Sequence, residues 1–170
     1  DYALYFAKWL QAMKDNGLNV NAITIQNEPL NRGNSASMYM GWDEQLAFIK
    51  KALGKTLRDK GFAEVKIYLF DHNYNYDNMP SQQQYPLHIY KDTEASQYIT
   101  GAAYHNYGGN PDELNNIHNQ YPNKELIFTE SSIGTWNDGR NLQRRLTEDM
   151  QELGIKTLNN HCKAVMVWNL

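Results

Sequence analysis

This chain lacks cysteine pairs, long apolar runs, an excess of positive charge and a visible signal peptide. Its 170 residues include one cysteine, Cys162, which can form no internal disulfide and is predicted to be a buried thiol. No apolar run approaches the ~20 residues of a transmembrane helix. Lys and Arg number 16 against 19 Asp and Glu, so no basic surface favours a nucleic acid partner. No signal peptide is visible, and because the first residues already follow a helical pattern, we expect the natural start to lie upstream.

Aromatic and amide side chains are plentiful instead. The chain has 12 tyrosines and 4 tryptophans, and asparagine is frequent. Such residues suit sugar rings, which need flat apolar faces and many hydrogen-bond partners. An ordinary aromatic core with polar loops explains the same composition, and composition alone slightly favours that ordinary interpretation.

Helical and strand patterns alternate along the chain. Helical periodicity from Tyr2 stops at Gly17, and a long amphipathic helix over 42–60 stops at Gly61. Further helices are predicted at 87–90, 95–99, 111–120 and 141–158. Short apolar runs predict strands at 20–26, 65–70, 100–104, 126–129 and 164–168.

This order predicts an α/β fold with a parallel sheet, because strands covered on both faces read as continuous apolar runs. Five strands are too few for an eight-stranded TIM barrel, which takes ~250 residues. The chain therefore has the length of a partial (β/α)8 barrel. Polar loops follow the strands, above all the Asn- and Tyr-rich segment 71–85, and barrel active sites lie at that end of the strands.

Two glutamates stand at the ends of predicted strands. Glu28 follows the apolar run 22–25 and precedes the turn at Pro29, and Glu130 follows the strand 126–129. Each is weak evidence alone, since strands often end in Glu. A pair at neighbouring strand ends would provide the acid and the second carboxylate that glycoside hydrolysis needs.

Several motifs resemble glycoside hydrolase family 30, which contains glucosylceramidase and endo-β-1,6-glucanases. Asn27-Glu28-Pro29 is similar to the acid/base motif of the wider clan, and segment 128–134 is similar to its nucleophile strand. Segments 41–45, 53–57, 66–71, 101–107 and 167–170 carry the rest of the match. The resemblance implies that residues 1–170 are a fragment of a single TIM-barrel catalytic domain, corresponding approximately to strands four to eight.

The resemblance also implies roles. Glu28 would be the acid/base and Glu130 the nucleophile of a retaining β-glycosidase, with no cofactor and no metal. Asn27 would bind the sugar 2-OH, Tyr107 would orient Glu130, and Trp168 would stack on the sugar. The remaining cleft residues would be Asp71, His72 and His105.

The substrate implied is a β-glucan or other β-linked glucoside. Two departures from glucosylceramidase-like members, at His72-Asn73 and at Asn106, favour a glucan-cleaving enzyme over one that acts on a lipid glycoside. Linkage, endo or exo cleavage and oligomeric state stay open. The family resemblance favours a secreted or periplasmic location.

Two alternatives remain. One is a catalytically incomplete half-barrel that needs strands one to three, with exposed sheet edges open to pairing. The other is a metal-dependent hydrolase that uses Asp71, His72 and His105, although their uneven spacing is poor evidence for a metal. Trp136, after the nucleophile strand, is a further candidate for sugar contact.

Overall fold

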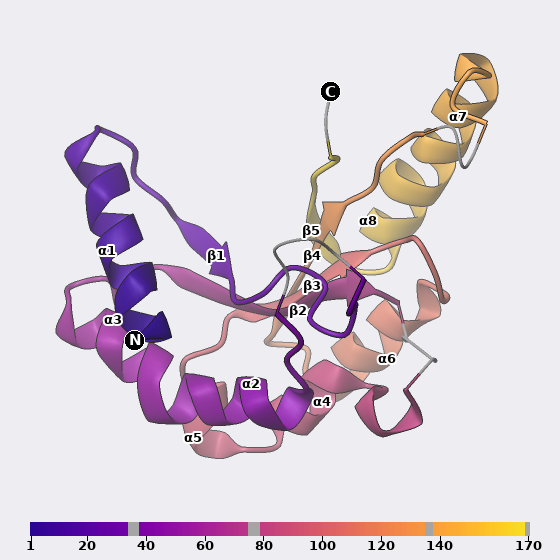
Figure 1. Ribbon diagram of the computed structural model, residues 1–170. Helices are drawn as coiled ribbons and strands as arrows, with labels where there is room; N and C mark the ends of the chain where they lie inside the picture. Colours follow the sequence, from indigo (N-terminus) through magenta and orange to yellow (C-terminus); the bar gives the residue numbers. More distant parts are fainter. Residues whose placement is uncertain (34–37, 75–78, 135–137, 169–170) are drawn as a thin grey trace. The chain divides into compact units, whose positions relative to one another are not determined.

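A computed structural model describes residues 1–33, 38–74, 79–134 and 138–168 (Figure 1). The chain divides into two compact units. The first comprises Asp1–Phe70 and Gln84–Thr100, and the second comprises Asp71–Gln83 and Gly101–Leu170. Among the described residues, no helix combines the length and the apolar character that crossing a membrane requires.

The first unit contains helix α1 (Tyr2–Asp15), strand β1 (Ala22–Thr24) and the first part of β2 (Lys66–Asn73). Between the strands, one helical segment runs through α2 (Trp42–Phe48), a π-helical stretch (Ile49–Leu53) and α3 (Gly54–Asp59). β1 and β2 pair in parallel, with Ile23 opposite Ile67. The unit also holds the short helices α4 (Tyr85–Tyr90) and α5 (Thr93–Ser96).

Both predicted glycine stops are confirmed. Gly17 and Gly61 have left-handed backbones, with φ of 79° and 83°. After each, the chain bonds back to the preceding turn, with Leu18 N donating to Met13 O and Phe62 N donating to Leu57 O. This is the helix ending in which a left-handed glycine allows terminal carbonyls to be satisfied.

The second unit contains the end of β2 and strands β3 (Gly101–His105), β4 (Glu125–Glu130) and β5 (Cys162–Val165). Helix α6 (Asp112–Gln120) connects β3 to β4. The connection from β4 to β5 is a helical segment built from α7 (Leu142–Asp149), a π-helical stretch (Met150–Lys156) and α8 (Thr157–Asn159). The hydrogen-bonded order of the strands is β1-β2-β3-β4-β5, and β1 pairs in parallel with β2, β3 with β4, and β4 with β5.

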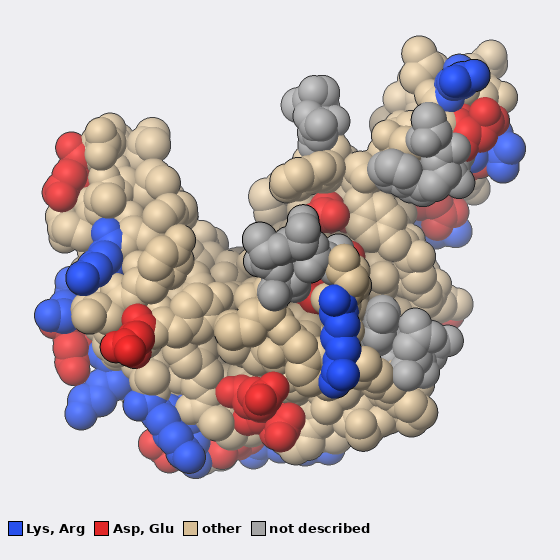
Figure 2. All heavy atoms as spheres, in the orientation of Figure 1, with Lys and Arg blue, Asp and Glu red and all other residues tan. Residues whose placement is uncertain are grey.

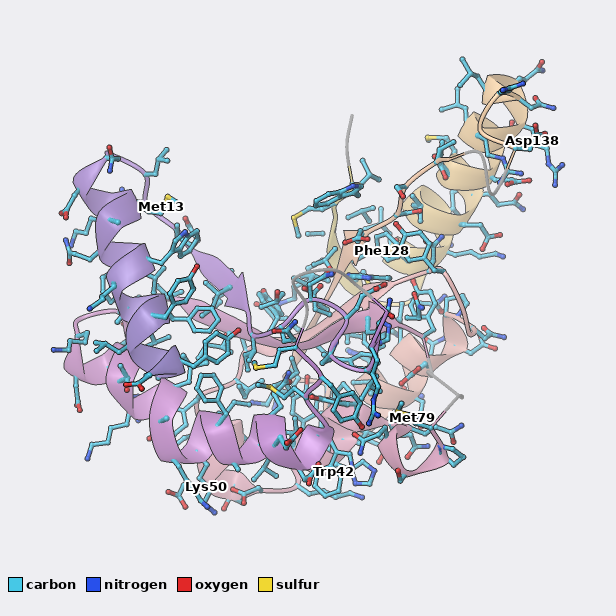
Figure 3. The ribbon with its side chains drawn as sticks, in the orientation of Figure 1. Met13, Trp42, Lys50, Met79, Phe128 and Asp138 are labelled. Carbon is cyan, nitrogen blue, oxygen red and sulfur yellow. The ribbon has the colours of Figure 1, made fainter. Side chains whose placement is uncertain are left out.

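Aromatic side chains fill the core of the second unit. Tyr74 stacks on Tyr104 with ring centroids 5.5 Å apart and lies 6.4 Å from the ring of Phe128, which is labelled on β4 in Figure 3. Burial raises the pKa of Tyr74. The predicted burial of Cys162 is confirmed at 5% exposure, and burial raises its pKa to about 12.

The α/β fold with parallel strands is confirmed, and the errors lie at element boundaries. The predicted loop 71–85 was wrong at both ends, because β2 continues to Asn73 and α4 begins at Tyr85. Within this stretch, Pro80–Gln82 form a single 3-10 turn. The fifth strand begins at Cys162, earlier than predicted, and ends at Val165. Trp136 lies outside the described residues.

The charged side chains of the last long helix are only partly exposed to solvent. Two adjacent arginines on α7 pair with one glutamate a turn later, and both signs of charge are visible on this helix in Figure 2. Arg144 is an exposed partner of Glu148. The side chain of Arg145 is only 12% exposed, although it binds the same carboxylate. Burial raises the pKa of Asp149, so this helix has a semi-buried polar side.

Candidate active site

Glu28 is held in an uncommon backbone conformation just after β1. Its φ is 43°, in the left-handed region that side chains with a Cβ rarely adopt. The side chain is 8% exposed, and Asn31 Nδ2 donates a 2.7 Å hydrogen bond to its Oε2. Asn31 N also donates to the main-chain oxygen of Glu28, which closes a tight turn. Strained backbone of this kind is concentrated at functional sites, where it aims a side chain that a regular strand could not.

Contacts on both sides fix this turn within the first unit. Tyr2 on α1 donates to the carbonyl of Ile25 at 2.7 Å, just before the turn. Met40 N donates to Pro29 O at 2.9 Å, just after it. Asn27, the predicted ligand of the sugar 2-OH, is exposed. The segment therefore presents an open amide beside a largely buried carboxyl group.

Glu130 ends strand β4 in the second unit. The hydroxyl of Tyr107 donates to Glu130 Oε1 at 3.2 Å and is hydrogen-bonded to Ser132 Oγ at 3.0 Å. The backbone N–H of Tyr107 donates to Asn73 Oδ1 at 3.0 Å. The structure thus contains the contact through which Tyr107 was expected to orient Glu130, and it adds Asn73 as an anchor for Tyr107.

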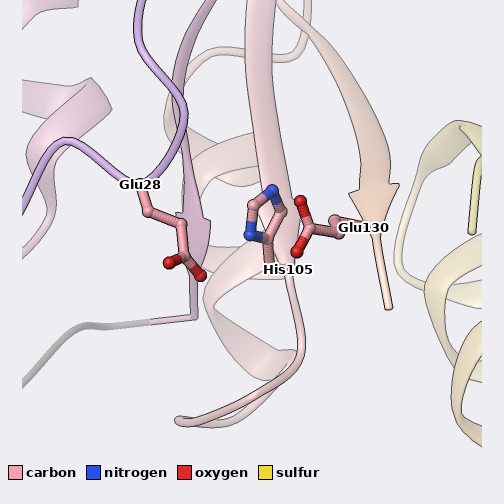
Figure 4. Close-up of side chains that lie close together, drawn as sticks. All are labelled: Glu28, His105 and Glu130. Carbon is pink, nitrogen blue, oxygen red and sulfur yellow. The ribbon is translucent and has the colours of Figure 1, made fainter. Parts of the chain in front are cut away.

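The other cleft candidates of this unit are buried. Asp71, His72 and His105 are 7%, 1% and 0% exposed. His105 Nε2 lies 3.1 Å from Asp71 Oδ1, and the same oxygen accepts a 2.6 Å hydrogen bond from Thr129 Oγ1. His105 on β3 lies beside Glu130 on β4, and a ring nitrogen and a carboxylate oxygen of this pair are within 4.8 Å (Figure 4).

Trp168 approaches the same strand end from beyond β5. The backbone N–H of Trp168 donates to the carbonyl of Ser131 at 2.8 Å, and Ser131 directly follows Glu130. The residue is 61% exposed, so its indole is available for the stacking contact predicted from the sequence. Glu130, Tyr107, His105, Asp71 and Trp168 are thus parts of one neighbourhood in the second unit, whereas Glu28 and Asn27 belong to the first.

A metal is poorly suited to the Asp71, His72 and His105 set. Asp71 Oδ1 faces two hydrogen-bond donors, His105 Nε2 and Thr129 Oγ1. The rings of His72 and His105 are nearly perpendicular, with centroids 6.5 Å apart. An oxygen that accepts two protein hydrogen bonds is typical of a structural network, so the metal-dependent alternative gains no support from these contacts.

Comparison with known proteins assigns the family. The family model described as glycosyl hydrolase family 30 TIM-barrel domain matches residues 1–170. The chain belongs to glycosyl hydrolase family 30. Its five parallel strands and their helices are therefore part of the family's TIM barrel.

The relatives of this family 30 chain include two kinds of enzyme. Endo-1,6-beta-D-glucanase BGN16.3 of Trichoderma harzianum is 32% identical over 175 residues, which cover 99% of this chain and 32% of that protein. Lysosomal acid glucosylceramidase of Mus musculus is 27% identical over 147 residues, covering 79% of this chain and 26% of that protein. The chain thus spans about a third of the length of the curated relatives it matches.

A solved structure is also similar. The endo-beta1,6-glucanase BT3312 is 63% identical, with a TM-score of 0.97 over 100% of this chain and 37% of the BT3312 chain. Structures of family 30 xylanases at 20% identity share the fold.

Three residues that contact the candidate site residues were not predicted from the sequence. Asn31, Asn73 and Thr129 touch Glu28, Tyr107 and Asp71, respectively. A signal existed for Asn31, because an asparagine two residues after Pro29 is typical of a turn, where its short amide bonds back to a nearby residue. Nothing in the sequence distinguishes Thr129 from an ordinary strand threonine.

A polar hollow of about 270 Å³ lies beside Tyr107 in the second unit. Asn106, Tyr107 and Ser132 line one side, and Arg145, Glu148 and Glu152 line the other. Asn106 is one of the positions at which the sequence departs from glucosylceramidase-like members. Asn106 therefore lines a hollow beside Tyr107, whose hydroxyl contacts Glu130.

Proposed function

We propose that this family 30 chain carries the two catalytic carboxylates of a retaining β-glycoside hydrolase. Glu130 is the nucleophile and Glu28 is the acid/base. The observation that carries the proposal is the hydrogen bond from Tyr107 to Glu130 Oε1, at the end of a barrel strand. An ionised carboxylate is an acceptor only, and a fixed hydroxyl donor leaves its other oxygen available for attack.

The reaction proceeds in two steps. In the first, a Glu130 oxygen attacks the anomeric carbon while Glu28 gives its proton to the departing glycosidic oxygen. In the second, Glu28 takes a proton from water, the water oxygen attacks the anomeric carbon, and the bond to Glu130 breaks. A retaining mechanism requires two carboxyl groups ~5–5.5 Å apart.

The other site residues bind and orient in this mechanism. Asn27 is exposed beside Glu28 and hydrogen-bonds the sugar 2-OH, a contact that strengthens in the transition state. The exposed indole of Trp168 stacks on the apolar face of the sugar. Both roles use groups that remain accessible while the carboxylates are held by neighbours.

The substrate that we propose is a β-1,6-linked glucan. Support comes from the relatives, since the Trichoderma harzianum protein and the BT3312 structure are both named as endo-1,6-glucanases. The sequence departures at His72-Asn73 and Asn106 agree with a glucan in preference to a lipid glycoside.

Replacing the nucleophile tests the mechanism directly. Glu130→Gln should abolish turnover and the covalent mass increase produced by a 2-deoxy-2-fluoro-β-glucoside with an activated leaving group. Glu125→Gln is the matched control, because Glu125 begins the same strand and pairs with the exposed Lys163. Labelling that persists in Glu130→Gln would sink the nucleophile assignment.

A panel of substrates tests the specificity. β-1,6-glucan should be cleaved faster than an aryl β-glucoside or a glucosylated lipid, and NMR should show the β-anomer as the first product. A first product with the α-configuration would contradict retention. Full turnover by the 170-residue chain alone would remove the alternative that this chain is an incomplete half-barrel.

A further inference from the structure

Strand β4 departs from regular pairing just before Glu130. Against β3, Phe128 is opposite Tyr104, but the next pair joins Glu130 to His105. One step on β3 therefore corresponds to two on β4, and Thr129 is the extra residue of a β-bulge. Because side chains alternate between the faces of a strand, a one-residue bulge changes the face on which every later side chain lies. The direction of Glu130 depends on this bulge.

The hydroxyl of the bulged residue is tethered. Thr129 Oγ1 donates to Asp71 Oδ1 at 2.6 Å, and the carbonyl of Tyr104 lies 3.4 Å from the same hydroxyl. Asp71 comes from β2, so its carboxylate reaches across β3 to hold a residue of β4.

Asp71 itself is built into place. It is 7% exposed, and the 3.1 Å contact with His105 Nε2 joins it to the strand between. Its φ of 58° is left-handed, as is the φ of 70° at Phe70, where an aromatic residue is rarely found. The hydrogen bond between Asp71 and Thr129 therefore joins two residues that both depart from regular strand geometry, one on β2 and one on β4. A buried aspartate in such a position is better suited to holding protein groups than to touching sugar.

We propose that Asp71 is a positioning residue that locks the Thr129 bulge and thereby sets the direction of the Glu130 carboxylate. The inference rests on the proposed function, because it assigns to Asp71 an effect on the attacking group. It replaces the direct sugar contact expected for Asp71 from the sequence. The consequence is that the Thr129 hydroxyl, which touches no reacting atom, controls the rate of attack.

A matched pair of variants tests this role. Thr129→Val keeps the shape of the side chain and removes the hydroxyl, whereas Thr129→Ser keeps the hydroxyl. Thr129→Val should lower kcat by about 10- to 100-fold with KM within about twofold, as expected when a reacting group is misplaced by a fraction of an ångström to 1 Å. The rate of covalent labelling at Glu130 by the fluoroglucoside should fall in parallel, and Thr129→Ser should stay close to wild type.

A spectroscopic readout separates positioning from general loss of structure. With ¹⁵N-labelled histidine, the Nε2–H of His105 should give a protected, downfield proton signal in the wild type. Asp71→Asn should shift or remove that signal and should slow labelling in the same way as Thr129→Val. Equal melting temperatures of the Val and Ser variants would exclude unfolding as the cause.

The outcomes distinguish failure of this inference from failure of the proposed function. If the wild type is labelled at Glu130 but Thr129→Val is labelled equally fast, the positioning role is overturned and the nucleophile assignment stands. If the wild type takes no label while β-glucan is still cleaved, the nucleophile assignment fails and the positioning role fails with it. Slow labelling of Thr129→Val together with normal labelling of Thr129→Ser supports the proposal.

Discussion

The two proposed catalytic glutamates are held in different ways. Glu28 lies in a tight left-handed turn after β1, where Asn31 is a hydrogen-bond partner of its carboxyl group. Glu130 ends a strand of the second unit, beside a bulge, with Tyr107 on its carboxylate and His105 at its flank. One carboxyl group is fixed by a turn and the other by neighbouring strands.

The difference matches what each role requires. An acid/base must gain and lose a proton within a cycle, so a turn that holds it through a neutral amide is compatible with either state. A nucleophile must stay ionised and aligned, which favours hydroxyl donors fixed by the sheet. Four predictions test this difference, and the first concerns the acid/base.

Glu28→Gln should have the largest effect of the four, because it removes the proton donor and the general base. Turnover of β-glucan should fall by about 10²- to 10⁴-fold, the range typical of general acid–base catalysis. An activated aryl glucoside, which needs no acid to depart, should still form the glycosyl-enzyme. Added azide should then accelerate turnover, because azide attacks without a general base, and product analysis should find the β-glucosyl azide. Absence of both the spared first step and the azide product would contradict the acid/base role.

Tyr107→Phe should have the next largest effect. Loss of one hydrogen bond to a charged acceptor corresponds to a reduction in kcat of about 10- to 100-fold. Tyr5→Phe is the control, since Tyr5 is 62% exposed on α1 of the other unit. Steady-state kinetics on an aryl β-glucoside provide the measurement. If both variants match the wild type, Tyr107 does not orient the nucleophile.

Asn31→Ala, which removes a contact to Glu28, should lower activity less than Tyr107→Phe, which removes a contact to Glu130. The turn keeps its main-chain hydrogen bond from Asn31 N to Glu28 O, so only the side-chain contact at 2.7 Å is lost. A fall in kcat/KM of about 3- to 10-fold is expected from one such bond. A larger loss of activity than in Tyr107→Phe would show that catalysis depends more on the side-chain contact to Glu28 than on the one to Glu130.

The smallest effect concerns stability at alkaline pH in the second unit. Burial raises the pKa of Cys162 from 9.0 to about 12, so the folded thiol stays protonated while the unfolded thiol ionises. The contribution is complete below pH 9 and is lost as the pH rises from 9 toward 12, by at most about 1.4 kcal/mol per pH unit.

Urea unfolding at pH 8.5 to 10 measures this slope, and Cys162→Ala should flatten it. Tyr74, whose pKa is also raised by burial, should maintain the loss of stability above pH 10 in that variant. An unchanged slope below pH 10 in Cys162→Ala would show that ionisation of Cys162 does not cause the loss of stability.

Much of the fold could be read from the sequence because its signals are local. Helix ends at Gly17 and Gly61 follow from the left-handed conformation that glycine tolerates, and the strands follow from apolar runs. The loop predicted over 71–85 was wrong at its start, because Asp, His and Asn are typical of loops but here continue β2 through Asn73. There the pairing of neighbouring strands outweighs local propensity.

Local sequence signals are enough to predict the alternation of parallel strands and helices, and to single out Glu28 and Glu130 after two of the strands. The direction of each carboxyl group follows only from the folded chain. The turn at Glu28, the bulge at Thr129 and the reach of Asp71 across β3 depend on contacts between residues 3, 34 and 58 positions apart. The last two contacts exist only after the strands are side by side, because cross-strand hydrogen bonds and bulges are properties of paired strands. The turn at Glu28 is local, but it is held from outside by Tyr2 and Met40.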